Sequence, residues 1–209
     1  MIVAQGDLDR SILLQGVSWN TYQRLRAADK NNHLRMTYDR GDLELMSPSQ
    51  RHERVNHLLG RMIDQWTLVK DIEIVAGRHT TFSRKDLGRG LEADNCYWIS
   101  NELAMRDVLD VDLTRDPPPD LAIEVDVTHS SIPKLPLYVA LRVPEVWHWR
   151  FETLEVLRLD REGTYRRRKA SAELPKFPIQ LAVRLIGQRS GTGDTAIIRQ
   201  FIRAIKLAR

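Results

Sequence analysis

The segment that most constrains this chain is residues 121–127, which read Leu-Ala-Ile-Glu-Val-Asp-Val. Side chains alternate between the two faces of a strand, so the pattern predicts one wholly apolar face and places Glu124 and Asp126 together on the other. Two like charges beside a core repel each other and lose hydration. A divalent cation offsets this cost, because Mg²⁺ and Mn²⁺ prefer oxygen ligands. An exposed sheet face is the alternative, and the pair taken alone favours it.

Patterns on either side of this segment predict further elements. Residues 34–39 and 43–46 flank Arg40 and Gly41, which indicates a hairpin in which Gly41 has a positive φ. After Ser49 a long amphipathic helix is expected, because apolar residues recur at helical spacing: Val55, Leu58, Leu59, Met62, Ile63 and Trp66.

The second half of the chain predicts a helix, a strand and a hairpin. The helix should begin near Ser131, with Pro133 in its first turn, and end before Pro144. In the strand at 146–151, alternation predicts that Trp147, Trp149 and Phe151 face the core. The order helix, strands, helix, strand, hairpin, helix predicts an α/β (α+β) domain with a mixed central β-sheet flanked by helices.

The chain is expected to divide into residues 1–186, which form the main domain, and residues 187–209, which form a linker and a C-terminal helix. The helix should begin at Asp194 and be amphipathic, because these residues share one face: Ile197, Ile198, Phe201, Ile202 and Ile205. That face should pack on the domain or on a second subunit.

Composition excludes several classes of protein. With 42% apolar and 29% charged residues, the 209-residue chain has the composition of a globular protein rather than of a disordered or collagen-like one. A single cysteine, Cys96, excludes an intramolecular disulfide and a multi-cysteine zinc site. No signal peptide and no membrane-spanning apolar run is visible, so a cytoplasmic protein is expected. The net charge of +4 permits local contact with nucleic acid without requiring it.

A second acidic segment favours the metal interpretation. Asp94 stands at the mouth of another predicted strand, on the same face as Cys96. If this strand pairs with residues 121–127, Asp94 and Glu124 can hold one metal ion between them. Lys134 then lies early on the following helix, where its ammonium can reach the site and stabilise charge on a phosphate. The alternative for Lys134 is a solvated helix lysine.

Four segments, in this order along the chain, resemble the Uma-type restriction endonucleases, a family abundant in cyanobacteria that belongs to the PD-(D/E)xK nuclease superfamily. Residues 35–48, RMTYDRGDLELMSP, resemble its opening signature, and residues 90–94, GLEAD, resemble its GLEPDE element. Residues 117–131, PPPDLAIEVDVTHSS, are similar to its second acidic motif. Residues 134–147, KLPLYVALRVPEVW, are similar to its lysine- and tyrosine-bearing helix.

The resemblance implies roles for particular residues. Asp94 and Glu124 would be the metal-binding acids. The superfamily has a lysine two residues after the second acid, where this chain has Asp126, so Lys134 would be the displaced lysine and Asp126 a further ligand or a supporting acid. Tyr138 would orient Lys134 or contact a phosphate.

Weaker candidates surround this set. Glu53 and His52 on the first long helix, and Glu44 on the hairpin, would add polar groups to the site. Contact with nucleic acid is expected from Arg51, Arg54, His52 and Glu53, and phosphate contacts are expected beyond them from Arg84, Lys85 and residues 166–169. His129 follows the acidic strand at a position open to a ligand.

The implied function is Mg²⁺-dependent hydrolysis of DNA phosphodiester bonds, with Mn²⁺ as a possible substitute, by a homodimer. The displaced lysine motivates a second hypothesis, a nuclease-fold module that binds nucleic acid or protein without cutting. A metal hydrolase acting on another phosphoester is the third.

Overall fold

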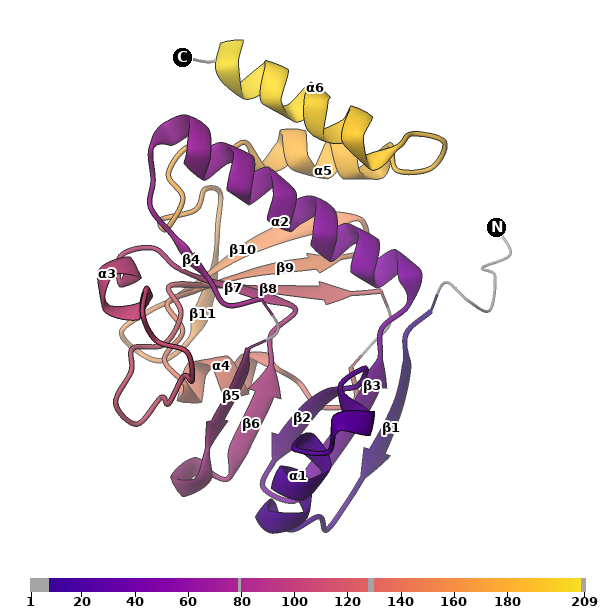
Figure 1. The fold of residues 1–209 in the computed structure, drawn as a ribbon, viewed down its shortest axis with the longest axis vertical. Helices are drawn as coiled ribbons and strands as arrows, with labels where there is room; N and C mark the ends of the chain where they lie inside the picture. Colours follow the sequence, from indigo (N-terminus) through magenta and orange to yellow (C-terminus); the bar gives the residue numbers. More distant parts are fainter. Residues whose placement is uncertain (1–7, 79, 128–129, 208–209) are drawn as a thin grey trace.

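The computed structural model describes residues 8–78, 80–127 and 130–207, which form two β-sheets and six α-helices (Figure 1). The helices are α1 (Trp19–Arg26), α2 (Gln50–Lys70), α3 (Glu102–Met105), α4 (Leu135–Ala140), α5 (Ile179–Gly187) and α6 (Asp194–Leu207), with short 3₁₀ helices at Asp29–Asn31 and Lys85–Leu87. In the part of the chain that the structure describes, no helix is both long and apolar enough to cross a membrane.

The first sheet is antiparallel. Its strands run in the order β1 (Arg10–Leu14), β3 (Asp42–Ser47), β2 (Arg35–Asp39), β6 (Arg89–Glu92) and β5 (Thr81–Arg84). A two-residue turn joins β2 to β3, and both of its residues have positive φ, 49° at Arg40 and 109° at Gly41. The predicted hairpin is confirmed, and this turn geometry matches the right-handed twist of the two strands.

The second sheet is mixed and holds the acidic strand at its centre. Its order is β11 (Tyr165–Arg168), β10 (Thr153–Leu159), β9 (Glu145–Arg150), β8 (Leu121–Asp126), β7 (Asn95–Trp98) and β4 (Val75–Ala76). Strands β8 and β9 are parallel, and the other neighbours are antiparallel. The α/β (α+β) fold class with a mixed central sheet is thus confirmed, although the first hairpin belongs to a separate sheet.

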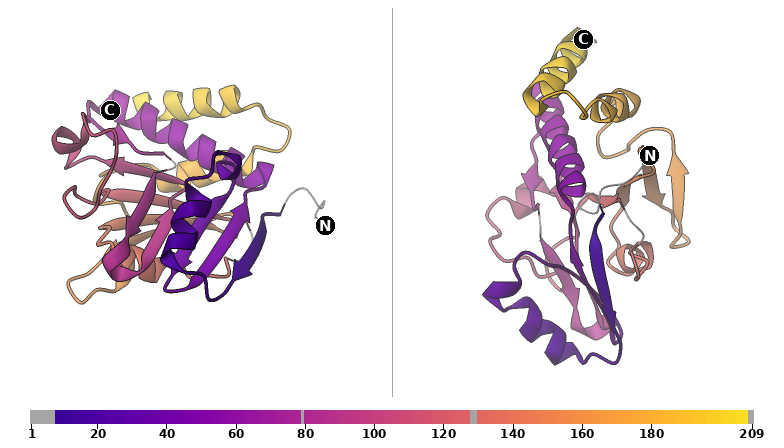
Figure 2. Two further views of the ribbon diagram at one scale, coloured as in Figure 1. Left: turned by 60° about the horizontal axis from the view of Figure 1, so that its bottom comes forward. Right: turned by 90° about the vertical axis from the view of Figure 1, so that its right-hand side faces the viewer.

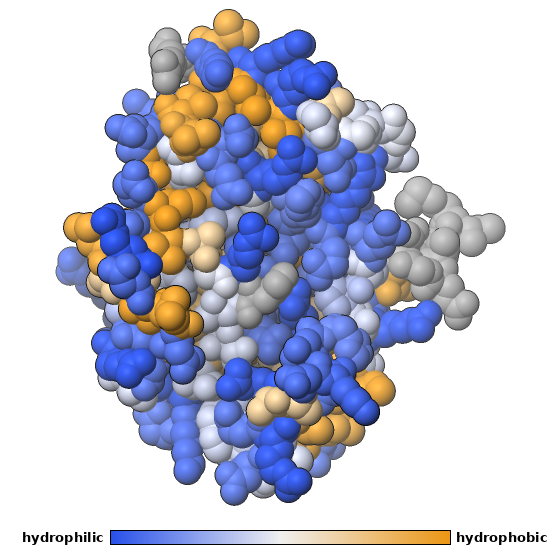
Figure 3. All heavy atoms as spheres, in the orientation of Figure 1, coloured by the Kyte–Doolittle hydropathy of each residue, from blue (hydrophilic) through white to orange (hydrophobic). Residues whose placement is uncertain are grey.

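Helices α2, α5 and α6 cover one face of the mixed sheet. Helix α2 is capped by Ser49, whose Oγ accepts a hydrogen bond from the His52 N–H, and its apolar face packs on the apolar face of β8, as its helical periodicity requires. Figure 2 shows α6 lying alongside α2. On the face drawn in Figure 3, apolar residues gather near the upper end, where these two helices lie, and polar residues cover most of the remainder.

Helix α4 covers the opposite face of the mixed sheet. Ala122 of β8 packs there with Cys96, Val146 and Leu137, all buried. Glu124 lies two residues beyond Ala122 on the same strand and therefore on the same face. The predicted division of β8 into an apolar face and an acid-bearing face is confirmed.

Two predictions of local structure were wrong. The helix expected from Ser131 begins at Leu135, because Pro136 rather than Pro133 occupies its first turn. Phe151 is not in the core: it lies in the turn after β9 with a φ of 48° and is 70% exposed. The strand expected after Asp94 is confirmed as β7, and Ala93 and Asp94 lie between it and β6, which belongs to the other sheet.

The C-terminal helix packs on the chain that carries it. Ile197, Ile198, Phe201 and Ile205 are buried in the same cluster as the apolar face of α2. Because one chain covers this face, the face gives no reason to expect a second subunit.

Candidate active site

The predicted site residues come from segments that the fold brings together between the two sheets. Glu124 lies near the end of β8, and Asp94 lies in the link between β6 and β7. Lys134 directly precedes α4, and Tyr138 is on that helix. Strand β7 pairs with β8, with Cys96 opposite Ala122, as the prediction of a shared metal site requires.

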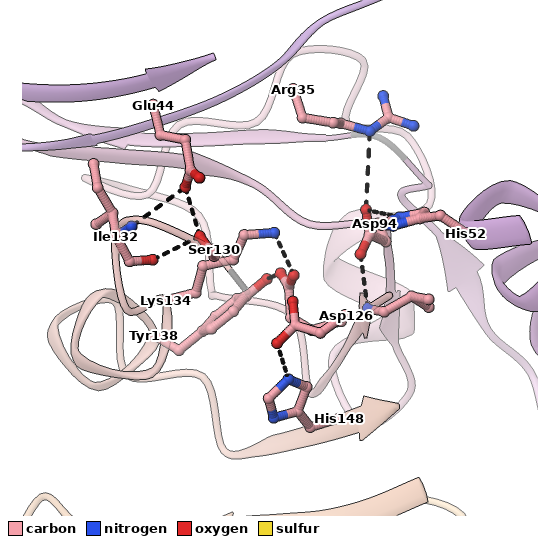
Figure 4. Close-up of polar contacts among 12 residues, drawn as sticks. Arg35, Glu44, His52, Asp94, Asp126, Ser130, Ile132, Lys134, Tyr138 and His148 are labelled. Carbon is pink, nitrogen blue, oxygen red and sulfur yellow. Dashed lines mark hydrogen bonds and ion pairs between the residues drawn. The ribbon is translucent and has the colours of Figure 1, made fainter. Parts of the chain in front are cut away.

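Two groups from the α4 segment, Lys134 and Tyr138, which Figure 4 labels, hold the carboxylate of Glu124. The Lys134 Nζ lies 2.5 Å from its Oε2, and the Tyr138 hydroxyl donates a hydrogen bond to its Oε1. The carboxylate is almost wholly buried, with 2% of the residue exposed. Burial raises the pKa of Glu124 above its ordinary value, and the Lys134 ammonium opposes this shift. Burial also disfavours the charge on Lys134, but Glu124 and Asp94 outweigh it and raise the pKa of Lys134.

Asp94 is held by groups from three other parts of the chain. His52 Nε2 lies 2.9 Å from its Oδ1, and the Val125 N–H donates to its Oδ2 at 2.8 Å. The Arg35 Nε lies 3.9 Å from Oδ1. Burial alone would raise the pKa of Asp94, but the charges of His52 and Lys134 outweigh it and hold this pKa below its usual range.

His52 is wholly buried and lies between two carboxylates. Its Nδ1 is 3.2 Å from Asp9 Oδ2, on the side away from Asp94. Burial opposes the charged ring, yet Asp94 and Asp9 raise the pKa of His52 to about 10, so the ring is an imidazolium at neutral pH. His52 therefore has no surface for a phosphate and acts as a cation inside the site.

Asp126 shares the face of Glu124 but has a different partner. Its Oδ2 lies 2.6 Å from His148 Nε2, and the parallel register sets His148 beside Glu124 and Arg150 beside Asp126. Glu124, Lys134, Asp126, His148 and Arg150 line one pocket of about 540 Å³. The alternation that turns Trp147 and Trp149 to the core turns His148 to the other face, and only the strand register reveals its place beside the acids.

Glu44 supports the segment that carries Lys134. Its carboxylate accepts hydrogen bonds from the Ser130 hydroxyl at 2.5 Å, the Ser131 N–H at 2.8 Å and the Ile132 N–H at 3.4 Å. Glu44 therefore ties β3 of the first sheet to the chain just before Lys134. His129, the other residue left open in this region, lies outside the described residues.

The other candidates on α2 take part in ion pairs within the chain. Glu53 pairs with Arg35 at 3.2 Å. Arg51 lies 2.5 Å from Glu152, and Arg54 donates to Asp194 and to the Thr192 carbonyl. Phosphate contact by Arg51 and Arg54 stays a prediction, and such contact would compete with these pairs.

Sequence reasoning missed Asp9 and Arg35 as parts of this site. Both lie far from Asp94 along the chain, and nothing in their local sequence distinguishes them from surface charges. Their contacts with His52 and Asp94 depend on how the first sheet packs against α2.

The two buried carboxylates fit a hard divalent cation. Asp94 Oδ1 is buried and has ion-pair contacts, but no hydrogen-bond partner of good geometry among the described residues. Across residues 8–78, 80–127 and 130–207, no three His, Cys, Asp or Glu side chains are grouped to hold a metal. Mg²⁺ is commonly bound through one or two carboxylates, with water and phosphate oxygens as its other ligands. Asp94 and Glu124 supply two such carboxylates.

Comparison with known proteins agrees with the geometry. No curated protein matches the chain. The model of the Uma2 family, described as "putative restriction endonuclease", matches residues 19–186 and so covers the chain from α1 to all but the last residue of α5, including every predicted site residue. The chain belongs to the Uma2 family.

Proposed function

We propose that this protein is a Mg²⁺-dependent endonuclease that hydrolyses DNA phosphodiester bonds at Asp94, Glu124 and Lys134. One observation carries the proposal: Lys134 Nζ lies 2.5 Å from Glu124 Oε2 although the two residues are ten positions apart. In the superfamily, the lysine beside the second acid stands at the position that Asp126 occupies in this chain. Here the α4 segment supplies the same ammonium to the same carboxylate.

Bound Mg²⁺ would polarise the scissile phosphate and lower the pKa of a coordinated water. The chain's own groups orient the site for that chemistry. Tyr138 and Lys134 fix the Glu124 carboxylate, and the Val125 N–H with His52 fixes that of Asp94. Lys134 would also place a positive charge beside the phosphoryl oxygens, which gain negative charge in the transition state. A preorganised cation at that position stabilises the transition state.

The DNA backbone would approach through the pocket beside α4. Lys134, His148 and Arg150 line it, so basic groups offset the carboxylates of Glu124 and Asp126. Arg150 also stacks on the Phe151 ring, 4.7 Å from its centroid, which keeps the guanidinium near the pocket rim.

A second candidate function is a nuclease-fold module that binds DNA without cutting it. The observation in its favour is that both carboxylates are almost fully buried and that each is already neutralised by a cation of the chain. Binding of a metal ion would have to weaken one of these contacts. The cytoplasmic location stays a prediction. The homodimer, which would supply two sites for cleavage of both DNA strands, also stays a prediction.

Nicking of supercoiled plasmid separates the two functions. The wild type, Asp94→Asn and Glu124→Gln are compared with and without Mg²⁺, and Glu162→Gln serves as the matched control because that side chain is 80% exposed. We expect nicking by the wild type and the control, and none by the two site variants. Equal nicking by all four proteins would identify a contaminant. DNA binding without any nicking would favour the non-cutting module.

A further inference from the structure

A second pocket adjoins the proposed active site on the side away from α4. It has a volume of about 260 Å³ and is lined by residues of α2, β4 and β7. Figure 1 shows where these three elements lie. Asp94 and Asn95 form one wall, and side chains one helical turn apart on α2 form the other. Asp94, one of the two proposed metal-binding residues, therefore lines this pocket. The pocket shares no lining residue with the one that Glu124 lines.

Asn56 lines the pocket and favours a ligand that carries a hydrogen-bond donor. Its Nδ2 donates to the Asp94 carbonyl at 2.9 Å, which fixes the orientation of the amide. Its Oδ1 is buried with no hydrogen-bond partner among the described residues, and the residue is 6% exposed. A buried acceptor without a partner is costly, so a ligand that donates to Oδ1 would gain affinity there.

Small residues give this pocket its space. Gly60 lies on the wall formed by α2, and a Cβ there would come within 3.0 Å of Asn95 Nδ2 and 3.4 Å of the Tyr97 hydroxyl. Ala76 lies on β4, at the other side. The Asn95 amide and the Tyr97 hydroxyl therefore lie against the backbone of Gly60, and a side chain at position 60 would push these two groups into the pocket.

The charges around the pocket are mixed. Arg61, Arg78 and His57 line it together with Glu53 and Asp64. A simple anion would meet two carboxylates, and a metal cation would meet two guanidinium groups. A neutral ring with donors and acceptors, attached to a phosphate that lies near the arginines, meets neither conflict.

We propose that this pocket takes one nucleobase of the nucleic-acid strand, next to the phosphate at Asp94, and so contributes to substrate selection. This proposal rests on the proposed function, because the nucleic-acid strand must pass Asp94 for one of its bases to reach the pocket. It goes beyond that function in assigning Asn56, Gly60, Asn95 and Tyr97 to base recognition.

Binding without cleavage tests the proposal. The probe is a short fluorescent single-stranded DNA of mixed sequence, compared by anisotropy, in EDTA, with a strand of equal length built wholly from abasic units. Both strands carry the same phosphates, so the ratio of their affinities isolates the bases. We expect the wild type to prefer the base-bearing strand about tenfold, as one satisfied buried acceptor allows.

Filling the pocket should remove most of this preference. Gly60→Ala adds a methyl group to the pocket wall, and alanine is the better helix former, so the fold should be kept. Its matched control is Gly187→Ala, the same change at a helical glycine whose Cβ would meet nothing within 4 Å. We expect the preference to fall several-fold in Gly60→Ala and to stay at the wild-type value in Gly187→Ala. Tyr97→Phe, which removes only a hydroxyl, should lower the preference less and serves if Gly60→Ala does not fold.

Other outcomes would overturn the proposal. These are no base preference in the wild type, an unchanged preference in both pocket variants, or free mononucleotides that bind as tightly as the strand. The plasmid assay judges the proposed function separately. A chain that nicks DNA without base preference refutes this inference alone, and a chain with a base preference sensitive to Gly60 that never nicks refutes the endonuclease alone.

Discussion

Replacing Lys134 by methionine keeps the length of the side chain and removes its charge, so it tests the ion pair with Glu124 in two ways. Both partners are buried, at 10% and 3% side-chain exposure, and Nζ lies 2.5 Å from Oε2. Removing one partner of such a pair leaves the other charge uncompensated, which typically costs about 3–5 kcal/mol of unfolding free energy. We expect the lower end of this range for Lys134→Met, because Glu124 can take up a proton and its pKa is already raised by burial.

The double variant, Lys134→Met with Glu124→Gln, removes both charges. It should be more stable than the sum of the two single changes predicts, by about 2 kcal/mol, the coupling expected for residues in direct contact. Cleavage should nonetheless stay lost in all three variants, with a fall of at least about 10²-fold for Lys134→Met if its charge stabilises the transition state. Urea unfolding followed by tryptophan fluorescence measures the first quantity, and plasmid nicking in Mg²⁺ measures the second. Additive stability changes would show that the pair makes no contact, and cleavage by the double variant would refute its catalytic role.

Three further outcomes are expected. Because Asp94 and Asp9 outweigh the opposing effect of burial and raise the pKa of His52 from 6.5 to about 10, its contribution to stability is fully present below about pH 6.5 and is lost as the pH rises through 10. Unfolding of His52→Gln should therefore show a flatter pH dependence over this range, and an equally steep one would contradict the assigned charge. Phe201→Ala should lower the unfolding free energy by about 3–5 kcal/mol in urea titrations, because Phe201 is fully buried where α6 meets α2; a change under about 1 kcal/mol would show that α6 is not docked there. Chelation by EDTA should abolish nicking and Mg²⁺ or Mn²⁺ should restore it, and nicking that persists in EDTA would exclude the metal mechanism.

The sequence predicts those parts of the fold that depend on local periodicity. The apolar face of α2, the Gly41 hairpin and the two faces of β8 follow from spacing alone, and each is confirmed. Strand β1 was missed because all five of its residues are exposed, so they show no alternation of apolar and polar side chains. Helix α4 was placed too early because two prolines compete for its first turn.

The candidate site shows the same division between local and long-range information. Asp94, Glu124 and Lys134 were predicted because the alternation of side chains along a strand and the family motifs can both be recognised in short segments. His52 was predicted only as a further polar group of the site and not as a cation beside Asp94, and Arg35, which reaches Asp94 from the other sheet, was not predicted at all. The pairing of Asp126 with His148 depends on the parallel register of β8 and β9, which no short pattern encodes.

Glu44 makes the position of Lys134 a joint property of both sheets. A hydroxyl and two backbone N–H groups just before Lys134 donate hydrogen bonds to the Glu44 carboxylate on β3. The distance between the Lys134 amine and Glu124 therefore depends on the position of β3. Transplanting the mixed sheet and α4 into another protein would therefore leave the lysine without its anchor. An engineer who shortened the β2–β3 hairpin by one residue would move the amine without altering any residue that lines its pocket.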